Sequence, residues 1–162
     1  MASDFFLKID GIDGESTDEK HTKWIDILSF QHGYSQPGGV DRSAVGGHTA
    51  GRVNVSEVTF MKQMDTASMP FADACATGKH IPKCEIEFCS ASGDKHTFMK
   101  YTLSDVLVSS YSISGSGGGE RPTESVSLNF GKIEQAYTPF DNTGKAGKDI
   151  RAVWNLATNK NA

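Results

Sequence analysis

Histidine and cysteine side chains are the groups of this sequence best suited to bind a metal ion or to act as nucleophiles. No two of the five histidines share the spacing of a zinc-ligand pair. Cys84 and Cys89 are five residues apart, which places them on opposite faces of one strand and outside a C-x-x-C motif. We interpret the three cysteines as packing residues and expect no metal and no cofactor, but a metal site assembled from distant strands stays open. The residues concerned are His21, His32, His48, His80, His96, Cys75, Cys84 and Cys89.

Two further stretches resemble ligand-binding loops but lack the spacing that such loops need. Asp10, Asp13, Glu15 and Asp18 do not follow the D-x-[DN]-x-[DN]-G pattern of an EF-hand, so we interpret them as part of a solvated loop with Asp-Gly turns. The glycines in 115–119 are followed by Glu-Arg-Pro and a strand, whereas a phosphate-binding P-loop continues into a helix. Neither G-x-S-x-G nor H-E-x-x-H occurs. The sequence therefore predicts a protein that is not an enzyme, with no catalytic residues.

Charge and hydropathy argue against two classes of partner. The net charge is −4 and the lysines and arginines form no run of five, so neither feature favours nucleic acid or an anionic membrane. No apolar stretch approaches the roughly 18 residues of a membrane helix, and no membrane insertion is expected. The first residues, MASDFFLKIDG, lack the regions of a secretory signal. We expect a protein made in the cytoplasm that leaves the cell, if at all, without a cleavable signal peptide.

Alternation of apolar and polar residues predicts that β-strands present most of these side chains. The alternation changes phase near Ser56 and Glu57 and again at Gly131, which predicts β-bulges of the kind that curve a sheet into a barrel. The expected strands span 5–9, 24–36, 53–60, 83–91, 95–103, 105–113, 124–137 and 150–156.

One short helix is expected at about 68–78, with Ser68 as its N-cap and Gly78 at its end. In the last strand, Ile150, Ala152 and Trp154 are expected to face inward. A polar tail follows at about 158–162. Residues 1–162 are thus predicted to form a single mainly β domain, a β-barrel with one side helix.

A glycine-rich loop at about 36–51, which we call the arm, separates the second and third expected strands. Five of its sixteen residues are glycine. A loop of this length without structure of its own is typical of a functional or binding element. The second expected strand is also apolar on both faces near its start. The barrel therefore exposes apolar surface, and self-assembly would bury this surface together with the arm.

Four segments in the same order resemble the haemolysin-coregulated protein (Hcp) family of the bacterial type VI secretion system. They read DGESTDEKHTKWIDILSF, VGGHTAGRVNVSEVTFMKQMD, SMPFADACATGKH and DVLVSSYSISGSGGGERPTESVSLNF. The resemblance covers about residues 5–156 and implies a ring-forming, phage tail-tube-like β-barrel of two sheets. It further implies homohexameric rings that stack into the inner tube of the secretion machine, carry or bind secreted effectors, and meet its sheath and spike proteins. A phage-type tail-tube protein, or another ring-forming β-barrel without a secretion role, is the alternative.

The resemblance also implies a role for the arm, which in this family meets a neighbouring subunit or the next ring. Gly46, Gly47 and His48 are expected to be central, because glycine permits close approach of the backbone. The expected contact residues are Gly38, Gly39, Val40, Asp41, Arg42, Ser43, Ala44, Val45, Gly46, Gly47 and His48.

The second strand offers candidates for the lumen of the ring. If Leu28 and Phe30 face the barrel core, Ser29 and Gln31 face away from it. That outer face is either the inner wall of the hexamer or an ordinary solvated or subunit-interface surface. The sequence leaves both open.

Overall fold

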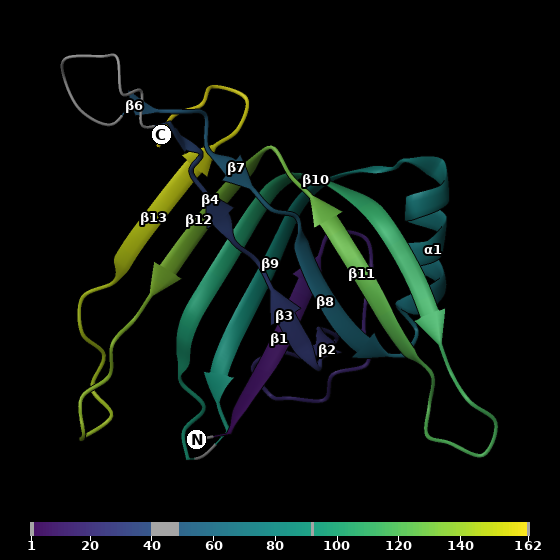
Figure 1. Cartoon of the computed structure of the whole chain (residues 1–162). Helices are drawn as coiled ribbons and strands as arrows, with labels where there is room; N and C mark the ends of the chain where they lie inside the picture. The colour runs from purple at the N-terminus through teal and green to yellow at the C-terminus, as the bar shows by residue number, and fades with distance from the viewer. Residues whose placement is uncertain (1, 40–48, 92, 162) are drawn as a thin grey trace.

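The protein is mainly β, with a long sheet that curls around one hydrophobic core (Figure 1). The structure, a computed structural model, describes residues 2–39, 49–91 and 93–161. Its helix is α1 (Ser68–Thr77). The strands are β1 (Ser3–Ile9), β2 (Ile25–Ile27), β3 (Ser29–Gln31), β4 (Tyr34–Ser35), β5 (Gly38–Gly39), β6 (Thr49–Ala50), β7 (Asn54–Val55), β8 (Val58–Gln63), β9 (His80–Ser90), β10 (Thr97–Ser114), β11 (Thr123–Asn129), β12 (Lys132–Tyr137) and β13 (Ile150–Asn155).

The strand order brings the two edges of the sheet together. Its main path is β2-β1-β9-β10-β11-β8-β3, and each neighbouring pair is antiparallel. The strands at the two ends of this path, β2 and β3, are separated in the chain by Leu28 alone. The Leu28 N–H donates to the Met61 carbonyl oxygen of β8 at 2.7 Å. The predicted β-barrel class with one short helix is confirmed, because residues 25–31 link both edges of the curled sheet.

The long strand β10 divides the sheet into two parts. β9 pairs along one edge of β10, whereas β12 and then β11 pair along its other edge. Between β11 and β12 the Gly131 N–H donates to the carbonyl oxygens of Ser104 and Asp105, at 2.9 and 3.2 Å. Here β11 continues to β8 and β3, while β12 pairs with β13 at the side of the barrel (Figure 1). The break expected between 103 and 105 is instead an irregularity within one strand, with φ of 54° at Asp105.

Both predicted changes of phase are confirmed, but the predicted β-bulge at Gly131 is wrong, because Asn129 pairs with Leu107 and Lys132 with Ser104, so that both strands advance three residues. On the two sides of Gly131, Phe130 and Ile133 are both buried although they are three residues apart. Gln31 of β3 pairs with Thr59 of β8, and Tyr34 of β4 pairs with Val55 of β7. Gln31 and Tyr34 are three residues apart, whereas Val55 and Thr59 are four apart. The chain from β7 to β8 therefore holds one extra residue around 56–57, as a β-bulge requires.

Helix α1 follows β8 and buries Phe71 and Ala74. Gly78 ends the helix in the left-handed conformation, with φ of 65°, as predicted. Ser68 is not the N-cap, because the helix starts one residue earlier than the sequence suggested. The N-cap is Ala67, whose N–H donates to Asp65 Oδ1 at 2.9 Å. No helix of the described residues is long and apolar enough to cross a lipid bilayer.

The expected pairing of Leu28 with Phe30 on the core face is wrong. Phe30 packs against the core, but Leu28 is 58% exposed, because the chain bends at this residue between β2 and β3. Ile25 and Ile27 are buried before the bend. Odd-numbered residues therefore face the core before Leu28, and even-numbered residues face it afterwards. The change occurs where the chain passes from one edge of the sheet to the other.

The last strand is also less buried than expected. Ile150 is 67% exposed and Ala152 is exposed, while Trp154 alone of the three packs against the core. Among the described strands β13 pairs with β12 alone and lies at the edge of the sheet, so its first residues do not pack on the core. The tail folds back, since Asn155 and Lys160 exchange backbone hydrogen bonds of 2.8 and 3.3 Å.

Candidate functional site

The outer surface formed by β3, β8, β11 and the second half of β10 carries no charged residue, and we call it the uncharged face. Cross-strand pairing aligns Ser29, Met61, Ser125 and Ser112 in one row across the four strands. Thr59 Oγ1 and Ser127 Oγ lie 3.0 Å apart on the same face. Its residues are Ser29, Gln31, Thr59, Met61, Gln63, Leu107, Ser110, Ser112, Ser114, Thr123, Ser125, Ser127 and Asn129.

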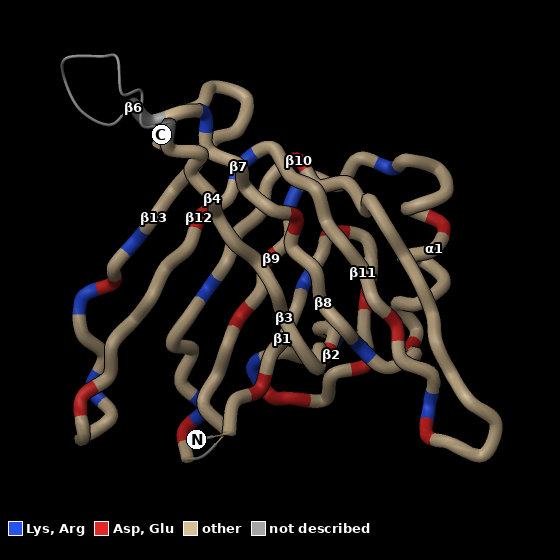
Figure 2. The backbone as a smooth tube through the Cα atoms, viewed as in Figure 1, with Lys and Arg blue, Asp and Glu red and all other residues tan. Residues whose placement is uncertain are grey.

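The outer surface of β1, β9, the first half of β10 and β12 has the opposite character, and we call it the charged face. One row across it reads Lys8, Glu85, Thr102 and Glu134. Ion pairs cross the strands, such as Lys100–Glu85 at 3.6 Å and Arg151–Glu134 at 3.1 Å. In Figure 2 charged positions recur along β9, whereas β3 is tan throughout. The barrel thus presents two chemically different outer surfaces.

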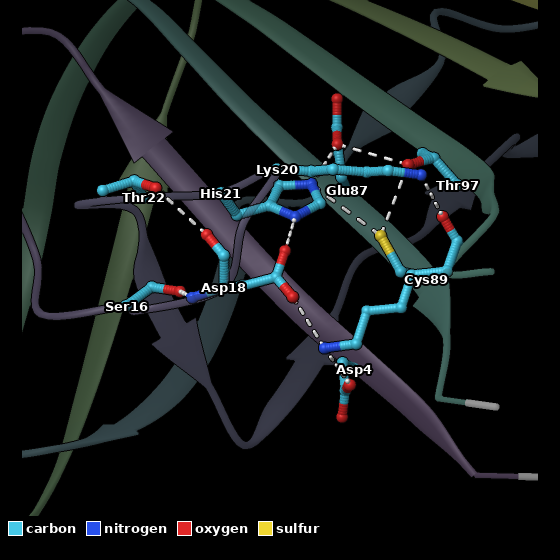
Figure 3. Close-up of polar contacts among 10 residues, drawn as sticks. Asp4, Ser16, Asp18, Lys20, His21, Thr22, Glu87, Cys89 and Thr97 are labelled. Carbon is cyan, nitrogen blue, oxygen red and sulfur yellow. Dashed lines mark hydrogen bonds and ion pairs between the residues drawn. The ribbon is translucent and has the colours of Figure 1, made fainter. Parts of the chain in front are cut away.

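The loop after β1 covers part of the charged face and inserts a buried histidine into it (Figure 3). His21 Nδ1 lies 2.7 Å from Asp18 Oδ2, and His21 Nε2 lies 2.6 Å from Glu87 Oε2. Cys89 Sγ lies 3.8 Å from the same Nε2 atom. Lys95 donates to Asp18 Oδ1 at 2.7 Å and, together with His21, lowers the pKa of Asp18 to about 2. We call His21, Asp18, Glu87, Cys89, Thr97 and Lys95 the His21 cluster.

Aromatic rings enclose the imidazole of His21. Phe6 stacks on it with ring centroids 4.2 Å apart, and Trp24 packs edge-on at 4.8 Å. Phe6 is buried although it points away from the barrel core, because the loop lies over it. The loop that the sequence suggested to be solvated is therefore anchored at its centre.

Sequence reasoning missed the His21 cluster because its members are far apart in the chain. His21 and Glu87 are separated by 66 residues, so no local spacing could reveal them. The prediction that Cys84 and Cys89 point to opposite faces is confirmed, since Cys84 belongs to the core cluster and Cys89 lies beside His21. Burial raises the pKa of the Cys89 thiol. Among the described residues, His21, Glu87 and Cys89 are the one group of three side chains close enough to share a metal ion.

The base of the arm is a narrow ladder of paired strands. β4 pairs with β7, and β5 then pairs Gly38 with Ala50 and Gly39 with Thr49. The Gly51 N–H donates to the Pro37 carbonyl oxygen at 3.3 Å, and a Cβ at Gly51 would lie only 2.8 Å from that oxygen. Glycine is therefore required at this point of the base. The ladder leaves the barrel near β12 and β13 (Figure 1).

The expected arm contacts fall into two groups. Gly38 and Gly39 form β5 at the base. The others, Val40, Asp41, Arg42, Ser43, Ala44, Val45, Gly46, Gly47 and His48, lie outside the described residues. Ser29 and Gln31 are exposed and belong to the uncharged face.

Comparison with known proteins identifies the family. Residues 6–137 match the family described as "Type VI secretion system effector, Hcp". Protein hcp1 of Pseudomonas aeruginosa is 39% identical over the whole of both chains. A solved structure described as a type six secretion system protein has a TM-score of 0.92 and 39% identity, covering 98% of this chain and 99% of its own. Hcp1 from Salmonella typhimurium has a TM-score of 0.79 and 34% identity, with both chains fully covered.

Fold, surfaces and comparisons together define a secreted structural protein of a bacterial type VI secretion system. The chain belongs to the Hcp family of that system. The resemblance noted in the sequence is thereby confirmed.

Proposed function

We propose that this chain is the subunit of the inner tube of a type VI secretion system, assembled as stacked homohexameric rings that carry or bind secreted effectors. Residues 1–162 act as one domain in this assembly. The protein is made in the cytoplasm, is secreted, and meets the sheath and spike proteins of the machine. The observation that carries the proposal is the presence of two unlike outer faces on one barrel, in a chain similar over its full length to a type six secretion system protein.

A closed ring of identical subunits needs two different contact surfaces on each subunit. Two of the places with exposed apolar side chains lie at separate ends of the sheet order. Ile150 and Tyr137 are paired on β13 and β12, where they are 67% and 46% exposed. Leu28, at the bend between β2 and β3, lies on the far side of the sheet order and is 58% exposed. Contact between these two patches in neighbouring subunits would bury both.

Within such a ring, the uncharged face is the better candidate for the lumen wall. Its hydroxyl and amide groups form hydrogen bonds with many partners and attract neither sign of charge, which suits a passage for varied effectors. Ser29 and Gln31 then line the lumen, and the charged face with its ion pairs points toward the sheath side. The family comparison supports the secretion role over a phage tail tube, because the similar proteins belong to type VI secretion systems.

The assembly is tested by the mass and shape of the purified protein. We expect a native mass about six times the 17.5 kDa of one chain, and rings with an open centre by negative-stain electron microscopy. Variants Ile150→Asp and Leu28→Asp, which place a charge in each apolar patch, should each lower the fraction of rings. A monomer at every concentration would contradict the proposal.

The lumen assignment predicts that Gln31→Arg weakens effector retention by about tenfold or more, which corresponds to about 1.4 kcal/mol. Six copies of the guanidinium would have to lose water against the cargo. The measurement is co-purification of an effector expressed with the ring. The matched control is Thr102→Arg on the charged face, where the new cation faces Glu85 and Glu134. Intact rings that retain the effector equally in both variants would refute the lumen assignment.

A further inference from the structure

The His21 cluster holds three side chains whose donor atoms converge on one point of the charged face (Figure 3). His21 Nε2, Glu87 Oε2 and Cys89 Sγ all lie within 4.8 Å of one another. They come from the covering loop and from β9, and Cys89 and His21 are buried. We propose that these three residues form a binding site for a zinc ion, with Asp18 as the outer carboxylate that orients His21.

The donor set suits zinc. Nitrogen, sulfur and carboxylate oxygen are the usual ligands of zinc, and three protein ligands leave a fourth position for water or another group. Tetrahedral zinc separates nitrogen and oxygen ligands by about 3.3 Å and nitrogen and sulfur ligands by about 3.6 Å. The present separations are 2.6 Å for Nε2 to Oε2 and 3.8 Å for Nε2 to Sγ. A small outward rotation of the Glu87 carboxylate accommodates the ion.

The surroundings of the three ligands resemble the outer shell of known metal sites. A histidine that binds metal through Nε2 usually donates its Nδ1–H to a carboxylate, which sets its tautomer. Asp18 Oδ2 accepts that hydrogen bond at 2.7 Å and is itself held by Lys95. The Thr97 hydroxyl donates to Glu87 Oε2 at 3.3 Å and lies 3.3 Å from Cys89 Sγ. His21 thus already has the orientation that binding needs, and Glu87 needs only the small rotation described above.

The charge of the site balances when zinc binds. At 2.6 Å, His21 Nε2 and Glu87 Oε2 must share one proton, because two unprotonated acceptors would repel each other. Cys89 carries a second proton as a thiol. Zinc replaces both protons, which pass to solvent, and binds neutral His21, the Glu87 carboxylate and the Cys89 thiolate. Two positive charges enter and two leave, so the net charge buried at this point is unchanged.

An acidic groove lies next to the cluster. A cavity of about 480 Å³ lies beside it, and Asp4, Asp18 and Asp26 are among its lining residues. These carboxylates raise the local concentration of cations. Asp18 and Lys95 form the wall between this groove and His21.

The test uses the full-length chain without a histidine tag, treated with a chelator and then titrated with zinc and, separately, with cobalt. We expect one zinc per chain, about two protons released, and a rise in the melting temperature. Cobalt should give the near-ultraviolet charge-transfer absorption of a thiolate ligand. Cys89→Ser should lose this absorption, whereas the matched control Cys75→Ser, a thiol on α1, should keep it. Asp18→Asn should weaken zinc binding by about 10–100-fold.

The proposal is overturned if wild-type protein with cobalt shows no thiolate absorption, or if Cys89→Ser binds zinc as tightly as wild type. The wild-type spectrum decides the question even where a variant fails to fold. The cluster would then be a structural anchor in which the shared proton joins His21 and Glu87. Ring formation, measured in the same samples, is a separate readout, because the zinc site does not depend on the tube proposal.

Discussion

Replacing Lys62 with methionine is expected to lower the free energy of unfolding by about 3–5 kcal/mol. The side chains of Lys62 and Glu124 are both fully buried, and the Lys62 ammonium lies 2.7 Å from Glu124 Oε2 and 2.8 Å from Asp65 Oδ1. Methionine keeps the bulk of the apolar stem but leaves the Glu124 carboxylate buried without its cation. Chemical denaturation at one fixed protein concentration measures the loss.

Two variants control for this result. The exposed pair Arg151–Glu134 is also an ion pair of β-strands, but Arg151 is 59% exposed, so Arg151→Met should change the free energy of unfolding by about 1 kcal/mol at most. The double variant Lys62→Met, Glu124→Leu should recover much of the stability, because no unpaired charge remains. Equal losses of unfolding free energy in Lys62→Met and Arg151→Met would show that the buried pair stabilises the protein no more than the exposed pair.

The effect of Lys62→Met should also depend on pH. Burial by itself raises the pKa of Glu124, but hydrogen bonds from Lys62, Ser68 and Tyr111 outweigh it and hold the pKa below its ordinary value of 4.5. A carboxyl group with a lowered pKa contributes stability above its unfolded pKa and loses it as the pH falls through the folded one. The difference between wild type and variant is therefore largest near neutral pH. It should shrink in acid, starting where Glu124 of the variant, which has lost its cation, becomes protonated.

Removing residues 40–47 of the arm and closing the ladder with an Asn-Gly turn is expected to abolish tube formation while the barrel stays folded. The ladder of β4 with β7 and β5 with β6 ends where this segment begins, so the deletion leaves the described pairs of the barrel untouched. If the arm contacts the next ring, stacking should require at least about 100-fold more protein, equivalent to about 2.7 kcal/mol. Electron microscopy counts tubes against single rings.

A second glycine-rich hairpin provides the matched control. Shortening the loop between β10 and β11 within 116–119 removes residues of similar composition, without touching the arm. That variant should form tubes like the wild type. Tubes of unchanged length in the arm variant would exclude the arm as the contact between rings.

Local sequence pattern determined the secondary structure of this protein well. Period-two alternation predicted the strands, because the side chains of a strand point alternately to two faces whatever the rest of the chain does. The phase change at Ser56–Glu57 predicted the β-bulge there, since an inserted residue shifts every later side chain to the other face. The phase change at Gly131 is also real, but β10 changes phase beside it, and neither strand has an inserted residue. Gly78 predicted the end of α1 for an equally local reason, because glycine readily adopts positive φ.

Local pattern failed where the position of a strand in the sheet decides burial. Leu28 is exposed because the chain bends there to join two edges of the sheet, and Ile150 is exposed because β13 lies at a free edge. Both are apolar residues in stretches that the sequence predicted to be strands. The residues next to them in the sequence do not determine which strand pairs beside them.

The two unlike outer faces and the His21 cluster were decided by tertiary structure alone. The uncharged face combines residues of β3, β8, β11 and β10, each of which contributes only a few polar positions that look ordinary in sequence. His21 meets Glu87 and Cys89 because β1 pairs with β9 and the following loop returns over that pair. The sequence alone determined the family and the strand pattern, since both depend on residues close in the chain. The surfaces for assembly and the proposed zinc site depend on contacts between distant segments, and only the folded barrel creates those contacts.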